Sequence, residues 1–212
     1  DHRTGNRRTG NMNGDIVRQR SELLRRVREF FYDRGFLEVE TPVLADEVIP
    51  ELHIEPVRVD RSGCLNATQE MFMKRLLASP LQRTGIAGIF QITRSFRAGE
   101  LGAMHRPEFT IVEWYRVGDD MHRGMELLDE FCQAMLDVPP AERVSYGAVF
   151  DRAVGIDPHR CDNKALESAA GELQDAAIPP AEAGSPGREL WLDWLWSARV
   201  EKSLPAEVPV IV

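Results

Sequence analysis

The sequence contains few cysteines, and none of them stands at a spacing that would hold a metal or form a redox pair. Cys64, Cys132 and Cys161 are far apart and odd in number, and no Cys-x-x-Cys occurs. This pattern argues against a zinc ribbon and against a thioredoxin-type site. Three scattered thiols are typical of a protein kept in a reducing cytosol, so we expect a cytoplasmic location.

The sequence also lacks a long apolar run and an excess of positive charge. No segment approaches the roughly 18 apolar residues that a membrane span needs, so we expect no membrane partner. The net charge of −8 argues against a broad electrostatic grip on nucleic acid. The only lysines are Lys74, Lys164 and Lys202, so arginine supplies nearly all of the positive charge.

The first residues, DHRTGNRRTGNMNG, are polar and glycine-rich and lack the apolar segment of a secretory signal. We expect residues 1–14 to form a disordered leader. The remainder has an ordinary globular composition, with 43% hydrophobic and 28% charged residues in the whole chain. We therefore expect residues 15–212 to form a folded core.

Hydrophobic periodicity predicts a mixture of helices and strands. Over 15–34 the apolar residues fall on one helical stripe, and Gly35 stands where a left-handed C-terminal cap belongs. Further helices are expected at 70–79, 121–136, 163–175 and 189–204, strands at 36–43, 88–96, 109–116 and 208–212, loop with a short strand over 44–66, and a proline- and glycine-rich linker over 177–189. The apolar strand at 208–212 needs a neighbour, which we expect to lie outside this sequence.

The stretch FRAGELGAMHRPEFTIVEWYR, residues 96–116, places a carboxylate on a strand face that is otherwise apolar. Alternate residues of a strand share a face, which here holds Phe109, Ile111, Glu113 and Tyr115. A carboxylate in such surroundings is costly to bury unless a cation meets it. Two interpretations stay open: an internal salt bridge from Glu113 to Arg94 or Arg116, or a cationic ligand.

Arg97 stands where the first strand of this hairpin ends and its loop begins. Its planar guanidinium suits a phosphate group, and Gly99 and Gly102 allow the loop backbone to come close to a ligand. Phe109 offers a ring to a flat base. The alternative interpretation is an ordinary hairpin loop with turn glycines.

Three segments, in this order, resemble class II aminoacyl-tRNA synthetases in their lysyl form. RSELLRRVREFFYDRGFLEVETPVL (20–44) resembles motif 1, TQEMFMKRLLAS (68–79) resembles the segment before motif 2, and F-R-x-x-E…H-x-P-E-F-T…E-W-Y resembles motif 2 itself. The Trp of the E-W-Y run, the short arginine-rich lead and the lack of an anticodon-binding domain resemble the branch that attaches lysine to elongation factor P. The resemblance covers residues 15–212 and implies an α+β fold with an antiparallel sheet flanked by helices.

The resemblance implies a role for each candidate residue. Arg97 would be the catalytic residue, holding the ATP α-phosphate and the attacking carboxylate, because its charge stabilises the pentacovalent phosphorus. Phe109 would stack on adenine, and Glu100, His105 and Arg106 would also lie at the nucleotide. The amino acid would be bound by Thr68, Glu70, Glu113 and Tyr115. A cationic substrate then explains the carboxylates, with lysine, ATP and Mg²⁺ as the implied ligands.

The sequence departs from the family pattern in two places. The family usually has Asn where this chain has Arg106, and Gly99 stands where many relatives carry a glutamate that Glu100 replaces here. Residues 117–212 contain no G-x-D-R or G-x-E-R run of the kind that motif 3 supplies. We therefore expect a core that is incomplete at its C-terminus, Mg²⁺ ligands that lie mainly outside this sequence, and a chain that cannot complete adenylation alone.

Three functions stay open. The first is ATP-dependent activation of lysine and its transfer to a lysine of elongation factor P. The second is tRNA aminoacylation by a lysyl-tRNA synthetase fragment, against which the negative net charge argues. The third is a non-catalytic paralogue that retains the pocket. The helix and strand of motif 1 form a two-fold interface in the family, so we expect a homodimer.

Overall fold

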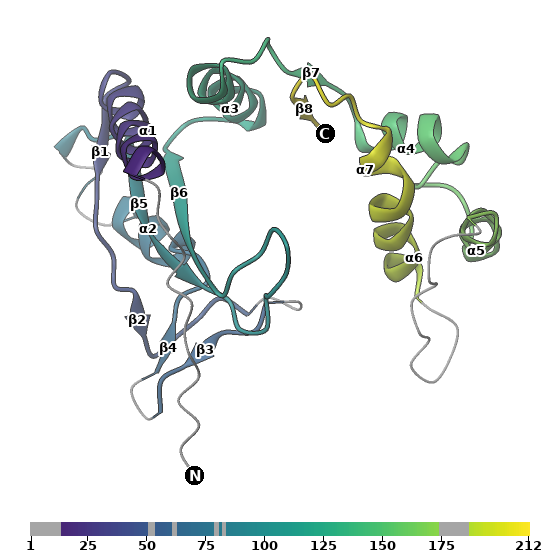
Figure 1. The fold of residues 1–212 in the computed structure, drawn as a ribbon, viewed down its shortest axis with the longest axis horizontal. Coiled ribbons are helices and arrows are strands. Elements are labelled where there is room, and N and C mark those ends of the chain that lie inside the picture. Colours follow the sequence, from purple (N-terminus) through teal and green to yellow (C-terminus); the bar gives the residue numbers. More distant parts are fainter. Residues whose placement is uncertain (1–13, 51–53, 61–62, 79–80, 82–83, 174–186) are drawn as a thin grey trace. The chain divides into compact units, whose positions relative to one another are not determined.

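The computed structural model describes residues 14–50, 54–60, 63–78, 81, 84–173 and 187–212 (Figure 1). The chain divides into two compact units, Asp1–Arg123 and Gly124–Val212, and each is described by itself. Residues 1–13 of the expected leader and most of the expected linker lie outside the described residues, while Gly14 already begins the first helix. The single core expected over 15–212 stays a prediction.

The first unit is built on a three-stranded sheet with the order β1-β5-β6. β5 (Gly88–Phe96) and β6 (Glu108–Arg116) pair antiparallel along their whole length, which confirms the predicted hairpin. β1 (Phe36–Glu38) lies parallel to β5, because the chain crosses from β1 to β5 by way of helix α2 (Glu70–Leu77). The sheet is therefore mixed, and the strand expected over 36–43 is shorter than predicted.

Helix α1 (Gly14–Tyr32) covers one face of this sheet with aromatic side chains. Phe31 is fully buried, and its ring stacks on Phe90 at a centroid distance of 4.7 Å and lies 5.3 Å from Trp114. Burial of such rings is the main favourable term for docking a helix on a sheet. The helical stripe predicted for this segment is thus confirmed as the packing face.

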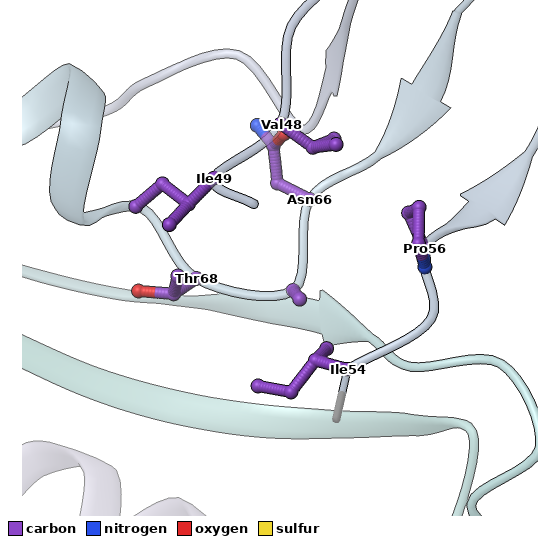
Figure 2. Close-up of a pocket in the computed structure, with 7 residues that line it drawn as sticks. Val48, Ile49, Ile54, Pro56, Asn66 and Thr68 are labelled. Carbon is purple, nitrogen blue, oxygen red and sulfur yellow. The ribbon is translucent and has the colours of Figure 1, made fainter. Parts of the chain in front are cut away.

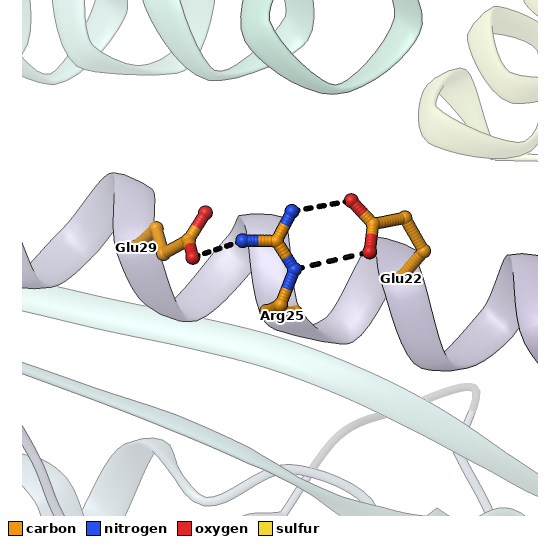
Figure 3. Close-up of polar contacts among 3 residues, drawn as sticks. All are labelled: Glu22, Arg25 and Glu29. Atoms are coloured by element: carbon orange, nitrogen blue, oxygen red, sulfur yellow. Dashed lines mark hydrogen bonds and ion pairs between the residues drawn. The ribbon is translucent and has the colours of Figure 1, made fainter.

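The opposite side of α1 is exposed and carries an ion-pair triad (Figure 3). Arg25 donates through Nε and one terminal nitrogen to Glu22, and through the other terminal nitrogen to Glu29. All three side chains are more than half exposed. The positive charge of this arginine is therefore matched within the helix itself.

Helix α2 covers the other face of the sheet. Met73 and Leu77 pack with Ile89 of β5, and Tyr115 of β6 lies against this cluster. Because neighbouring strand residues point to opposite faces, Tyr115 faces α2 while Trp114 faces α1. The predicted sharing of one face by Glu113 and Tyr115 is therefore confirmed.

A small antiparallel sheet with the order β2-β4-β3 stands beside the end of the hairpin. Its strands are β2 (Leu44–Ala45), β3 (Val57–Arg58) and β4 (Cys64–Leu65). Asn66, which is 2% exposed, ties the two sheets together. Its backbone N–H donates to Val43 O at 2.9 Å, and its carbonyl accepts from the N–H of Phe96 at 3.0 Å. This link holds the chain just before α2 against the hairpin.

The second unit is mainly helical. After α3 (Met121–Leu136), whose predicted bounds are confirmed, come α4 (Tyr146–Val154), α5 (Asn163–Gly171), α6 (Arg188–Leu195), a π-helical turn (Trp196–Val200) and α7 (Glu201–Ser203). Its core consists of Val149, Phe150, Leu166, Ala170, Trp191, Leu195 and Val200. In the part of the chain that the structure describes, no helix combines the length and the apolar character of a membrane span.

Two features of this unit differ from expectation. β8 (Val210–Ile211) pairs in parallel with β7 (Glu142–Arg143), so the terminal strand has its neighbour within this chain and the expectation of an outside partner was wrong. Helix α4 was not predicted. Its signals are Ser145, whose hydroxyl accepts from the N–H of Ala148, and Gly155, which ends the helix at a φ of 80°.

Candidate active site

The first group of candidate residues lies where β5 passes into the hairpin loop. Arg97 Nη1 is 3.6 Å from Glu100, and the guanidinium carbon lies 5.0 Å from the centre of the Phe109 ring. The Nε of Arg97 is buried and has no hydrogen-bond partner among the described residues. Gly99 adopts a φ of 75°, which a glycine tolerates without strain. The structure thus brings Arg97, Glu100 and Phe109 together around a guanidinium that is not fully partnered.

The tip of the loop is organised by its own backbone. Arg106 Nη1 donates to the carbonyls of Gly102 at 2.6 Å and His105 at 3.0 Å, and the N–H of Gly102 donates to His105 O at 3.2 Å. His105 and Arg106 are both exposed. Arg106 therefore stiffens the loop in this structure, and neither residue joins the cluster around Arg97.

Glu113 is held by the turn that precedes α2. Thr68 Oγ1 donates to one carboxylate oxygen, and the backbone N–H of Gln69 donates to the other at 2.7 Å. Arg94 and Arg116 pair instead with Glu108 at 3.6 Å and Asp119 at 2.7 Å. The interpretation of Glu113 as half of a salt bridge with Arg94 or Arg116 is therefore wrong. The two groups that donate to its carboxylate are neutral, so they do not compensate its negative charge.

A buried polar cluster, which the sequence reasoning missed, stands behind this turn. Gln69 is fully buried, and Thr41 Oγ1 lies 2.9 Å from the amide oxygens of both Gln69 and Gln91. Asn66 adds a contact of 3.4 Å to the Gln69 oxygen. Buried polar networks fix side-chain positions because each unmet group is costly. The only signal in the sequence was the polar run N-A-T-Q before the α2 helix.

Glu70 and Tyr115 complete the second group. Burial raises the pKa of the Tyr115 phenol, and the negative charges of Glu113 and Glu70 raise it further. Lys74, one helical turn beyond Glu70, forms an ion pair with it, and its Nζ lies 5.6 Å from the centre of the Tyr115 ring. The structure therefore brings Thr68, Glu70, Glu113 and Tyr115 together as predicted, and adds an unpredicted cation.

A small pocket opens beside Thr68 (Figure 2). It is lined mainly by apolar side chains, those of Val48, Ile49, Ile54, Pro56 and Ala67, with Asn66 and Thr68. Its volume of ≈ 10 Å³ suits about one water molecule. This pocket is thus too small for an amino acid or a nucleotide, and the candidate site is the open face of β6 next to it.

The two groups lie on the same face of β6. Phe109 and Glu113 are four residues apart on the strand, which corresponds to about 13 Å. A guanidinium and an aromatic ring therefore stand at one end of the face, and two carboxylates with a phenol at the other. Such a face fits an elongated ligand with a phosphate and a flat base at one end and ammonium groups at the other.

No group of three or more His, Cys, Asp or Glu side chains that could hold a metal ion occurs in the described ranges. Among the described residues, the side chains therefore offer no ready-made site for Mg²⁺.

The class of protein is established by sequence comparison. The family described as "tRNA synthetases class II (D, K and N)" matches residues 4–153. That match covers more than half of the chain, and the chain belongs to this family. The α+β fold expected from motifs 1 and 2 is confirmed.

Within this family, the chain is similar to curated proteins of one name. The chain is 36% identical over 203 residues to the "Elongation factor P--(R)-beta-lysine ligase" of Salmonella arizonae, covering 92% of this chain and 60% of that relative. Proteins of the same name from Salmonella paratyphi B and Salmonella heidelberg match with the same identity and coverage. The chain thus spans about 60% of the length of these curated relatives.

Proposed function

We propose that this chain provides the nucleotide- and lysine-binding face of a ligase that activates lysine as an adenylate and transfers it to a lysine of elongation factor P. The relatives carry (R)-β-lysine in their name, so the substrate class is lysine or its β-isomer. Both isomers carry two ammonium groups and one carboxylate, which the two ends of the β6 face complement. ATP would bring Mg²⁺ with it, and the cytoplasm stays the expected location.

The observation that carries this proposal is the order of groups along one strand face. Arg97 and Phe109 lie at the loop end, where they would meet the α-phosphate and the adenine ring. Glu113 and Tyr115 lie further along the same face, beside Glu70 on α2. A lysyl adenylate presents its base, phosphate and ammonium groups in this order. Arg97 would then stabilise the charge that develops at phosphorus during attack by the substrate carboxylate.

Elongation factor P is favoured over tRNA as the acceptor by two observations. The relatives named above carry elongation factor P in their name. The net charge of −8 also offers no broad attraction to a polyanion.

A homodimer through α1 is part of the proposal. The first half of α1 exposes three apolar side chains, Ile16, Val17 and Leu23, at 58%, 47% and 43%. Apolar side chains left exposed on a helix that otherwise packs well favour a partner surface. Analytical ultracentrifugation of the wild type and of Leu23→Glu would test this: a dimer that the substitution dissociates supports it, and a monomer at all concentrations contradicts it.

The proposed nucleotide site is tested by calorimetric titration with ATP·Mg²⁺ and with a non-hydrolysable lysyl-adenylate analogue. We expect Arg97→Ala to weaken binding of the analogue about 10- to 100-fold, since a hydrogen bond to a charged group contributes about 1.5–3 kcal/mol. Arg94→Ala is the matched control, because Arg94 is exposed on the same strand and pairs with Glu108. Equal binding by wild type and Arg97→Ala would contradict the proposal. Absence of binding to the wild type would also contradict the proposal, because it would mean that this chain does not form the nucleotide site.

A further inference from the structure

Lys74 brings a cation to the place where the proposed function requires a substrate ammonium. Its Nζ is paired with Glu70 and lies 5.6 Å from the centre of the Tyr115 ring. Glu70 and Tyr115 are both members of the predicted lysine-binding group. The Lys74 side chain is 59% exposed, so it can swing into water without disturbing a packed core.

The two carboxylates of this group are satisfied in different ways. Glu113 accepts from the Thr68 hydroxyl and the Gln69 N–H, which are both neutral, so its full negative charge remains available. Glu70 is paired with the positive charge of Lys74. A ligand with one ammonium group is therefore attracted by Glu113 at once, whereas a second ammonium reaches Glu70 only by competing with Lys74.

We propose that Lys74 is a placeholder cation, which occupies the Glu70 subsite when the site is empty and is displaced by an ammonium group of the substrate. This inference rests on the proposed lysine site and adds a specificity-determining residue to it. Lys74 weakens the binding of ligands with two ammonium groups relative to those with one, because only the second ammonium has to displace it from Glu70. An ordinary Glu–Lys pair one turn apart on a helix would not respond to such a ligand.

The scarcity of lysine makes this displacement directly observable. Reductive methylation with ¹³C-formaldehyde keeps the lysine charge and labels only Lys74, Lys164, Lys202 and the N-terminus. We expect the Lys74 methyl signal, assigned with Lys74→Arg, to shift when lysine or (R)-β-lysine is added. L-Norleucine, which lacks the terminal ammonium, should leave it unmoved. Lys164 and Lys202 are exposed in the second unit and serve as internal references.

Substitution gives a second, independent readout by calorimetry. We expect Lys74→Met to bind lysine about 2- to 5-fold more tightly than the wild type, a change of the size that exposed ion pairs contribute. Its affinity for norleucine should stay unchanged, so its preference for lysine over norleucine should rise. Lys164→Met is the matched control and should leave both affinities unchanged.

The outcomes separate this inference from the function on which it rests. Lysine binding with an unmoved Lys74 signal and an unchanged affinity in Lys74→Met overturns the placeholder and leaves the proposed lysine site intact. No binding of lysine to either the wild type or Lys74→Met overturns both. Binding by Lys74→Met where the wild type binds weakly supports both.

Discussion

Trp114 and Glu113 are neighbours on β6, yet they face opposite sides of the sheet and opposite kinds of surroundings. On the α1 side, Trp114 meets the ring of Phe31, which also stacks on Phe90. On the α2 side, Glu113 meets a hydroxyl and a backbone N–H. One face of the strand is therefore closed by ring packing, and the other stays polar and open to a ligand.

The α2 side changes its character within two residues. At one register position Ile89 lies opposite Tyr115, next to buried Met73 and Leu77. At the next position on that face Gln91 lies opposite Glu113. The apolar part holds α2 in place, and α2 in turn fixes the turn that binds the carboxylate. Packing and the proposed ligand binding thus involve different residues of the same strand, and substitutions should separate their effects.

The largest expected effect is on stability and belongs to the α1 side. Phe31→Ala should lower the free energy of unfolding by about 3–5 kcal/mol, since it leaves a cavity among the rings of Phe36, Phe90 and Trp114. Urea denaturation measures this change. Gln19→Ala is the control on the same helix, because Gln19 is exposed and its substitution should cost at most about 0.5 kcal/mol. Equal losses in the two variants would contradict the assignment of this face to packing.

The hairpin and the face that Glu113 and Tyr115 share could be predicted because their signals are local. The period of two along 109–116, bounded by a loop with glycines, gave β6 to within one residue and placed Glu113 and Tyr115 on one face. The resemblance to motif 2 then indicated which of these residues would bind a ligand, since periodicity alone left a salt bridge and a ligand as equally open interpretations of Glu113.

The remainder of the site could not be predicted because it depends on contacts between distant segments. Thr41 reaches Gln69 and Gln91 across 28 and 50 residues, and nothing in the local pattern indicates either contact. The β7–β8 pair was missed for a similar reason. β7 is only Glu142–Arg143, two exposed charged residues without a strand pattern, and it becomes a strand only because the distant β8 pairs with it.

The next largest effect is on binding and belongs to the α2 side. Glu113→Gln should weaken lysine binding about 10-fold or more, because it removes a carboxylate charge that only neutral donors meet among the described residues. Its effect on stability should be about 1 kcal/mol, since the new amide N–H₂ faces a donor. Calorimetry and urea denaturation measure the two quantities. Glu108→Gln, at the exposed end of the same strand, is the control and should change neither lysine affinity nor stability. If Glu113→Gln loses stability but still binds lysine normally, the Glu113 carboxylate has a structural role only.

A smaller effect tests how Glu113 is positioned. Thr68 accepts from the N–H of Glu70 at 3.2 Å, which directs its own proton toward Glu113. Thr68→Val removes this donor and should lower stability by about 0.5–1.5 kcal/mol and lysine affinity a few-fold. Thr68→Ser keeps the hydroxyl and should restore the affinity. If the serine variant behaves like the valine variant, the methyl group rather than the hydrogen bond is what matters.

The smallest effect is a pH dependence at Tyr115. Burial and the charges of Glu113 and Glu70 raise the pKa of this phenol above its ordinary value of about 10. Above pH 10 the unfolded chain releases the phenol proton while the folded chain retains it. The free energy of unfolding is therefore unaffected by this group below pH 10 and falls as the pH rises toward the pKa of the folded state. As the pH is raised above 10, the free energy of unfolding of Tyr115→Phe should therefore fall less than that of the wild type. Urea denaturation at a series of pH values measures this difference. Because Glu113 and Glu70 help to raise the pKa, Glu113→Gln should reduce the same pH dependence. A Glu113→Gln profile identical to that of the wild type would mean that the phenol does not sense this carboxylate.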